Sequence, residues 1–396
     1  MKITSVKTYP LSVPTGQEIR DPGTGELLCS TMKSWLFLKL ETDAGISGWG
    51  EGSGEWLVQP VETLLRQLVP LLLDRDPTRV EALTDDIVNF APWKGGPIIG
   101  TAVAAINMAL YDIAGKAWGV PVHAILGGRR RDRIQVYASG GLVESSPAEA
   151  AETARKQIAN GYAGVKGNPL ESRRAPMELA AIARSLECIA AVREAIGPDP
   201  AILLDTHGSP TPELSIEFAR RAAPYAPMFL EAPVKVGSVD ALMDVTQRSP
   251  VPVATGEQLF AAREFEELIQ RRACAFLQPD ITHCFGITAF CEIAKSANRQ
   301  QMLMAPHNVA GPVANAAAFH ASAVTPNFLI LEMAPSYFER YDQYAEHDWQ
   351  IADGYINVSD RPGLGIEVKE ADIAKLPLEP MAFRQYRHAD GSWKGW

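Results

Sequence analysis

The sequence lacks several features that would assign the protein to other classes. It contains no run of 18 apolar residues that could span a membrane, and Met1-Lys-Ile-Thr-Ser5 has no apolar segment typical of a secretory signal. Only five cysteines occur in 396 residues, and none forms a C-x-x-C pair. This argues against a disulfide framework and favours reduced thiols. We therefore expect a cytoplasmic protein.

Positive charge is also scarce. Lys and Arg number 37 against 47 Asp and Glu, so the formal net charge is −10. Nucleic acid and anionic membrane surfaces are poor partners for such a chain. The 46% hydrophobic and 21% charged residues are instead ordinary for a soluble enzyme, and the length favours two domains.

The first 130 residues predict an α+β domain. Residues 3–11 alternate in polarity, 34–42 are strongly strand-like, and a turn at Asp43-Ala-Gly45 leads into a third strand, which together indicate an antiparallel meander. Helical periodicity follows over residues 59–90 and 101–118. Between the first two strands, Val13–Met32 forms a connection of about 20 residues, and loops of that length are usually functional or mobile.

From residue 131 strand and helix patterns alternate, which predicts a (β/α)₈ TIM barrel over residues 131–339. The expected strands are 134–138, 163–166, 202–205, 228–231, 251–254, 276–280, 302–306 and 328–332. The expected helices are 147–160, 176–196, 211–223, 238–248, 261–271, 286–298 and 312–323. No eighth helix of similar quality is visible, so we expect a modified last unit. Residues 340–396 are expected to pack back on the N-terminal capping domain.

Three acids recur at the ends of consecutive predicted strands. Asp205, Glu231 and Glu257 are each 26 residues apart (205 to 231 and 231 to 257), which is the period of a βα unit. In a barrel the carboxyl ends of the strands form the active-site face. Three carboxylates that converge there repel one another unless a cation lies between them, and Mg²⁺ is the natural candidate.

Other polar residues follow neighbouring strands. His207 lies two residues after Asp205, and strand alternation predicts that both side chains point into the barrel mouth. Asp280 ends the sixth strand and His307 follows the seventh, so Asp280 is placed to fix the tautomer of His307 and raise its basicity. Lys166 and Glu332 end the second and eighth strands.

Each of these residues also has an ordinary structural explanation. A single acid at a strand end is more often a helix cap than a ligand, and a lone histidine is more often a loop residue than a catalyst. We therefore assign no role to His123, His283 or His320. The functional interpretation rests on the joint occurrence of these residues, because polar residues fall at the ends of strands two to eight while the strand interiors stay apolar.

The combined pattern resembles the enolase superfamily, mandelate racemase subgroup, and within it the galactonate-dehydratase-like acid-sugar dehydratases. The resemblance covers almost the whole chain. Its motifs include Gly48-Trp-Gly-Glu51, Asp205-Thr-His-Gly208, Glu231-Ala-Pro233, Gly256-Glu257, Leu277-Gln-Pro-Asp280, Ala305-Pro-His307, Pro362-Gly-Leu-Gly365 and Arg387-His-Ala-Asp390.

The resemblance implies a role for each site residue. Asp205, Glu231 and Glu257 would bind Mg²⁺, His307 backed by Asp280 would be the general base, and His207 the general acid. Glu332 would hydrogen-bond the substrate carboxylate, and Lys166 would help to stabilise the enediolate. Asn168 stands where racemases of the subgroup carry a second lysine, which favours elimination over racemisation.

The implied activity is Mg²⁺-dependent dehydration of an aldonic or aldaric, galactonate-like sugar acid to a 2-keto-3-deoxy acid. A sugar-acid lactone cycloisomerase, an epimerase and, more remotely, a non-catalytic metal-binding barrel are alternatives. We expect a homo-oligomer, either a dimer or an octamer. Two departures, Ala232 in place of a second glutamate and the long Val13–Met32 loop, leave the identity of the sugar acid open.

Overall fold

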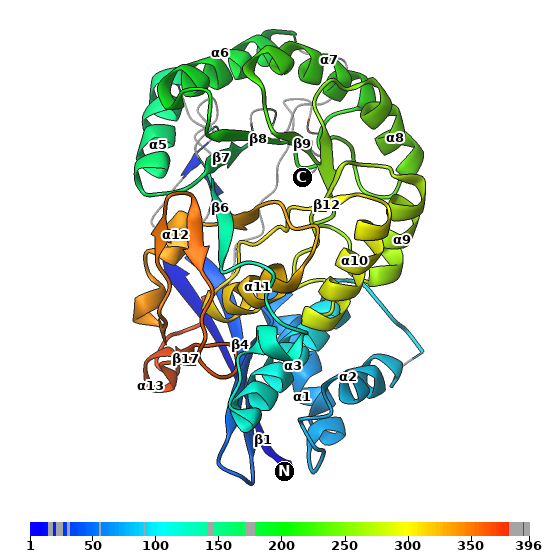
Figure 1. Ribbon diagram of the computed structural model, residues 1–396, viewed down its shortest axis with the longest axis vertical. Coiled ribbons are helices and arrows are strands. Elements are labelled where there is room, and N and C mark those ends of the chain that lie inside the picture. The colour runs from blue at the N-terminus through cyan, green and yellow to red at the C-terminus, as the bar shows by residue number, and fades with distance from the viewer. Residues whose placement is uncertain are drawn as a thin grey trace.

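The computed structural model describes residues 1–396 except 15–18, 21–26, 30–31, 55–56, 91, 141, 143–145, 169, 171–178, 380–390 and 392–396. Much of the Val13–Met32 loop and the Arg387-His-Ala-Asp390 motif therefore lie outside the described residues. A ring of helices surrounds a set of strands in one half of the molecule, and the N-terminal domain lies against one side of that ring (Figure 1).

The N-terminal domain contains the expected meander. Strands β1 (Ile3–Pro14), β4 (Met32–Thr42) and β5 (Ser47–Glu51) form an antiparallel sheet in the order β1-β4-β5. A separate short hairpin joins β2 (Ile19–Arg20) and β3 (Leu27–Cys29). The three-stranded sheet confirms the antiparallel prediction for this part of the chain.

Helices α1 (Val58–Leu72) and α3 (Pro97–Trp118) pack on this sheet, and α2 (Val80–Asn89) packs against these helices. Helices α1 and α2 divide the region expected to be helical over 59–90. The prediction of continuous helix was wrong there, because the chain leaves the helix at Leu73 and turns through Asp74, which has a positive φ of 60°. Helix α3 is long and apolar enough to cross a membrane, but its residues from Gly100 to Gly115 are buried, as in a core helix.

The eight barrel strands lie at the predicted places. They are β6 (Arg133–Ser139), β7 (Gly164–Gly167), β8 (Ala201–Asp205), β9 (Phe229–Glu231), β10 (Val253–Thr255), β11 (Phe276–Leu277), β12 (Leu303–Met304) and β13 (Leu331–Met333). However, β11 and β12 are shorter than expected, and Asp280 lies three residues beyond the end of β11. Neighbours from β6 to β12 pair in parallel, and β13 pairs with β6. A parallel bridge from Met304 to Phe328 closes the ring.

Seven helices follow the first seven barrel strands. They are α5 (Pro147–Ala159), α6 (Leu179–Ile196), α7 (Pro212–Ala222), α8 (Val239–Arg248), α9 (Ala262–Arg271), α10 (Ile287–Arg299) and α11 (Pro312–Val324). Side chains of Ser146, Thr211 and Ser238 cap α5, α7 and α8. After β13 comes only the four-residue α12 (Pro335–Phe338), as the weak eighth pattern predicted.

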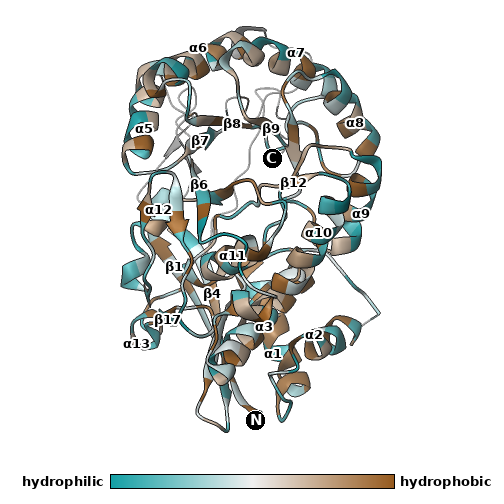
Figure 2. Cartoon of the chain, viewed as in Figure 1, coloured by the Kyte–Doolittle hydropathy of each residue, from teal (hydrophilic) through white to brown (hydrophobic). Residues whose placement is uncertain are grey.

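Apolar side chains fill the space inside the strands. A cluster of Tyr137, Leu203, Phe229, Ala254, Ala305 and Ile330 packs there, separate from the larger core between strands and helices. In Figure 2 the outer helices alternate between hydrophilic and hydrophobic colours, because only one face of each is buried. The filled interior confines polar chemistry to the ends of the strands.

Buried polar contacts join the N-terminal domain to the barrel. Glu51, at the end of β5, accepts hydrogen bonds from the backbone N–H of Gly311 (2.6 Å) and Ala314 (3.0 Å) at the start of α11. Asn107 of α3 accepts one from the N–H of Ile287 (2.9 Å) at the start of α10. These bonds fix the capping domain over the loops that follow β11 and β12.

The C-terminal segment contacts both parts of the molecule. Its short elements are η3 (Tyr341–Gln343), β14 (Ala345–Glu346), β15 (Ile351–Ala352), β16 (Tyr355–Asn357), β17 (Glu367–Val368) and α13 (Glu370–Ile373). Glu370 forms an ion pair with Lys39 of β4 at 2.7 Å, whereas β16 pairs antiparallel with β6. Part of this segment therefore packs on the capping sheet and part extends the barrel sheet.

Candidate active site

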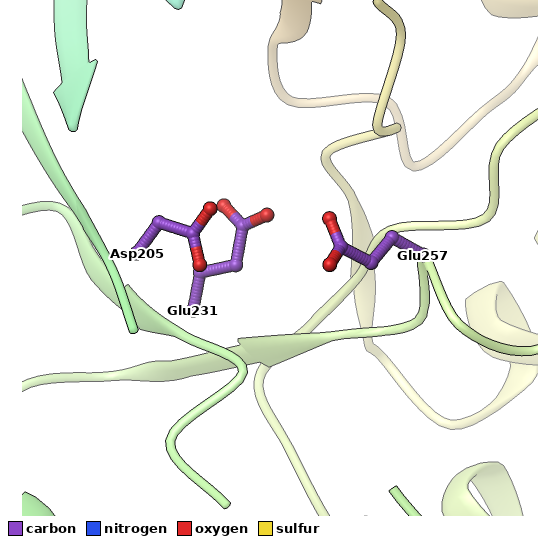
Figure 3. Close-up of side chains that lie close together, drawn as sticks. All are labelled: Asp205, Glu231 and Glu257. Carbon is purple, nitrogen blue, oxygen red and sulfur yellow. The ribbon is translucent and has the colours of Figure 1, made fainter. Parts of the chain in front are cut away.

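Three carboxylates lie together at one end of the barrel. Asp205 is the last residue of β8 and Glu231 the last of β9, while Glu257 lies two residues beyond β10. One oxygen of each lies within 4.8 Å of the others, and Figure 3 shows the three side chains pointing toward a common space. Glu257 reaches this space from a turn at Gly256 (φ 145°) rather than from the strand end itself.

The electrostatics of this cluster fit a divalent cation. Burial and the charges of Asp205, Glu332 and Glu257 raise the pKa of Glu231 to about 8, although the charge of Lys166 opposes them. Among the described residues, Oε2 of Glu231 is buried without a hydrogen-bond partner. Hard oxygen donors that are short of positive charge are the ligand set Mg²⁺ prefers, so these residues fit that ion.

Lys166, on β7, already supplies one positive charge at the site. Its Nζ lies 2.9 Å from Glu231, 2.8 Å from Glu332 and 3.6 Å from Asp205. Although burial favours the neutral amine, the charges of Glu231 and Glu332 hold the pKa of Lys166 well above its usual value. One ammonium thus neutralises part of the charge of the four carboxylates at the mouth.

His307 and Asp280 form the expected pair. Nδ1 of His307 lies 2.6 Å from Oδ2 of Asp280. Although burial opposes it, the nearby imidazoles of His283 and His307 and the hydrogen bonds from His307 and Thr282 hold the pKa of Asp280 below its usual range. An ionised carboxylate only accepts hydrogen bonds, so the ring carries a proton on Nδ1 and, when neutral, presents the Nε2 lone pair to the site.

The protonation of His307 depends on the surrounding carboxylates. Although burial favours the neutral ring, the charge of Glu332, the hydrogen bond to Asp280 and the charge of Glu257 raise the pKa of His307 to about 10. Its Nε2 lies 3.5 Å from Glu257 and 3.9 Å from Glu332. A cation among the carboxylates would oppose these charges and favour the neutral ring that a base requires.

His207 lies near the cluster for a different reason from the one expected. Strand β8 ends at Asp205, and His207 occupies a turn with a positive φ of 47°. The turn, not strand alternation, brings Nε2 of His207 to 2.8 Å from Asp205. A non-glycine residue in this conformation is uncommon and costs roughly 1–3 kcal/mol, a cost often found at functional sites.

Asn168 holds the other nitrogen of the His207 ring. Its Nδ2 lies 2.7 Å from Nδ1 of His207, while its Oδ1 accepts a hydrogen bond from the N–H of Leu170. The amide group therefore faces His207 as a donor, so Nδ1 accepts and the ring carries a proton on Nε2. Although burial opposes it, the charge of Asp205 raises the pKa of His207 to about 10, which favours the charged ring, whereas the Asn168 donor favours an unprotonated Nδ1. In either state Nε2 carries the proton that a general acid needs.

A cavity of about 480 Å³ opens over these residues. Its floor includes Lys166, Asp205, His207, Glu257, His307 and Glu332. The capping domain adds Lys33, Gly54, Leu57, Pro97 and Thr101, and helix α12 adds Ser336 and Tyr337. Asp280 lies behind His307, and Glu231 lies behind Lys166.

Several residues that line this cavity were not among the predicted site residues, and one of them is a histidine. His283, which we had assigned no role, lies in the cavity wall close to His307. Its position three residues after Asp280, in a loop that follows a barrel strand, was a usable signal. His123 and His320, in contrast, lie beside each other and do not line the cavity.

Comparison with known families agrees with this fold. Residues 149–372 match the enolase C-terminal domain-like family, and residues 15–127 match the N-terminal domain of the mandelate racemase / muconate lactonizing enzyme family. The chain belongs to this group of the enolase superfamily, as the sequence resemblance indicated.

The chain is also similar to individual proteins of this family. The chain is 33% identical over 372 residues to a D-galactonate dehydratase of Ralstonia nicotianae, and 34% identical over 370 residues to one of Variovorax paradoxus. Each match covers 91% of this chain and 96% of the relative. A solved structure of an enolase superfamily member from Salmonella Typhimurium matches with a TM-score of 0.83 and 25% identity, covering 94% of this chain and 99% of that one.

Proposed function

We propose that the protein catalyses the Mg²⁺-dependent dehydration of an aldonic or aldaric, galactonate-like sugar acid to a 2-keto-3-deoxy acid. The observation that carries the proposal is the placement of two imidazoles. His307 follows the seventh barrel strand and His207 the third, so the two rings approach the carboxylate cluster from across the barrel. Groups on opposite sides can act on two different substrate carbons, as an elimination requires.

Asp205, Glu231 and Glu257 would hold the metal ion. Bound Mg²⁺ would supply positive charge that stabilises the negative charge developing on the substrate carboxylate when the neighbouring C–H bond breaks. Lys166 adds charge of the same sign from the protein. Glu332, in its protonated form, would donate a hydrogen bond to the carboxylate as it gains enediolate character, in a buried site where such interactions are strong.

The chain's own residues then move two protons. His307 takes the proton from C2 at Nε2 while Asp280 keeps the ring oriented through Nδ1. His207 gives its Nε2 proton to the C3 hydroxyl, which leaves as water when the C–O bond breaks. The enol that remains tautomerises to the 2-keto-3-deoxy acid. Each general acid or base contributes about 10²- to 10⁴-fold to the rate.

The alternative functions differ from dehydration in what they require of the site. An epimerase needs a second base or acid on the opposite face of C2, and the position of the second racemase lysine holds the amide of Asn168, which neither gains nor loses a proton near neutral pH. A lactone cycloisomerase would use His307 in the same way but would lose no water. A barrel that only binds metal would have no need for the oriented His307–Asp280 pair.

A library of aldonic and aldaric acids and their lactones, incubated with the protein and Mg²⁺, tests the proposal. Dehydration predicts a 2-keto acid that reacts with semicarbazide, at a rate that His307→Asn abolishes. C2 proton exchange in D₂O without keto acid would indicate an epimerase, and lactone isomerisation without keto acid a cycloisomerase. If no acid or lactone reacts, the enzymatic proposal is wrong.

The oligomeric state and the cellular compartment of the enzyme remain predictions. We expect a homo-oligomer, a dimer or an octamer, in the cytoplasm, and light scattering of the purified protein measures its mass directly.

A further inference from the structure

His283 occupies a defined place beside the proposed base. It lies in the loop after β11, where the N–H groups of His283 (3.0 Å) and Cys284 (2.8 Å) both donate to the carbonyl oxygen of Asp280. Its ring centre is 6.4 Å from that of His307, with 26° between the ring planes. The same short turn therefore carries both the partner of His307 and a second imidazole that lines the cavity.

The capping domain holds this turn in place. A Cβ atom on Gly100 of α3 would lie 2.4 Å from the carbonyl oxygen of His283, so only glycine allows the helix to approach so closely. On the other side, Phe260 packs with its ring centre 6.1 Å from that of His283. A residue whose backbone packs against Gly100 and whose ring packs against Phe260 loses little entropy when it binds a ligand, which favours a positioning role.

The two ring nitrogens of His283 have different surroundings. Among the described residues, Nδ1 is buried without a hydrogen-bond partner, which leaves Nε2 as the nitrogen available to the cavity. A proton on Nδ1 would be an unsatisfied buried donor, and buried N–H groups are rarely left unpaired. Nε2 therefore carries a proton and is a hydrogen-bond donor, whether the ring is neutral or charged.

Part of the cavity wall is apolar. Phe260, Val309, Leu57 and Pro97 line the same cavity and offer no polar side-chain atoms. In sites that are largely apolar, a few placed polar groups fix the orientation of a ligand. A polyhydroxylated acid brings several hydroxyl oxygens that need partners once water is displaced.

We infer that His283 binds the substrate by donating a hydrogen bond from Nε2 to a hydroxyl oxygen of the sugar chain, on the same side of the cavity as His307. This inference rests on the proposed function and extends it to substrate recognition. The bond orients the carbon chain so that C2 faces His307, and it selects acids that carry a hydroxyl at that point.

Two variants separate hydrogen bonding from packing. His283→Phe keeps a ring against Phe260 but removes the donor, whereas His283→Gln places an amide N–H close to the position of Nε2. We expect His283→Phe to lower kcat/KM by about 10- to 100-fold, mainly through KM, and His283→Gln to recover most of the loss. Equal kinetics for wild type and His283→Phe, or an equal loss in both variants, would overturn the inference.

Deoxy analogues of the preferred acid identify the contacted hydroxyl. The analogue that lacks this hydroxyl should react equally well with wild type and His283→Phe, whereas the other analogues should keep the difference between the two enzymes. If every analogue shows the same ratio, His283 makes no specific hydroxyl contact and the inference is wrong.

A binding measurement gives a readout independent of turnover. In a His307→Asn background, calorimetry with Mg²⁺ and the unreacted acid should show weaker binding for His283→Phe than for His283→Gln, at similar melting temperatures. Absence of both turnover by the wild type and binding by His307→Asn would refute the proposed function, and this inference with it. Normal turnover with no effect of His283→Phe would refute this inference alone.

Discussion

Replacing Asp280 with Asn tests the proposed base through its tautomer. One carboxylate oxygen of Asp280 faces Nδ1 of His307 at 2.6 Å, and the other accepts the backbone N–H of Thr282 at 2.7 Å. A backbone N–H can only donate, so an asparagine must turn its oxygen toward Thr282 and its amide group toward His307. Nδ1 of His307 would then accept a hydrogen bond, and the ring proton would move to Nε2.

The expected loss is large because the affected nitrogen is the one that takes the C2 proton. An Asp-to-Asn change that inverts the tautomer of a catalytic histidine lowers kcat by about 10⁴-fold in the serine protease triad. That factor corresponds to about 5.5 kcal/mol of barrier height. We expect Asp280→Asn to lower kcat by about 10³- to 10⁴-fold, with the three metal ligands left intact.

The assay combines turnover with proton exchange. Keto-acid formation gives kcat, and nuclear magnetic resonance in D₂O follows exchange at C2, which should slow with it. Thr282→Val is the matched control, because it removes the hydroxyl bond to Asp280 but keeps the backbone N–H; we expect less than about a 10-fold change. If folded Asp280→Asn that still binds Mg²⁺ turns over within 10-fold of wild type, the tautomer argument fails.

Three further predictions follow from the same structure. Removing metal with EDTA should abolish activity and Mg²⁺ should restore it, so full turnover by metal-free protein would contradict the carboxylate assignment. His207→Asn should lower keto-acid formation by about 10²- to 10⁴-fold, and normal dehydration by this variant would exclude His207 as the acid. His320 is buried, accepts the N–H of His123 at Nδ1 and faces the carbonyl of Leu364 with Nε2, and burial lowers its pKa from 6.5 to about 3. Between these values the unfolded chain binds a proton that the folded protein does not, so stability rises with pH across this window and falls as the solution is acidified. In urea unfolding, the free energy of unfolding of the wild type should be lower by about 1.4 kcal/mol at pH 5.5 than at a pH well above 6.5 because of His320, and His320→Asn should lack this contribution. Identical pH dependence of the two proteins would refute this.

Local chemistry made much of the fold and site predictable. The spacing of Asp205, Glu231 and Glu257 reports the length of a βα unit, and that length depends on strand and helix geometry that every barrel shares. Apolar runs ending in acids therefore placed the carboxylates at one end of the barrel before any contact was known. The pairing of Asp280 with His307 followed in the same way, since neighbouring parallel strands end side by side.

Only the tertiary structure determined the conformations of the loops that follow the barrel strands and the positions in which these loops place their side chains. His207 reaches Asp205 through a left-handed turn, Glu257 reaches the cluster from beyond Gly256, and His283 enters the cavity wall because Gly100 of the capping domain packs against its backbone. Strand periodicity ends where the strand ends, so it carries no information about such turns. Their conformations depend on packing against residues far away in the sequence. The identity of residues at the site could thus be read from the chain, whereas their orientation required the assembled domains.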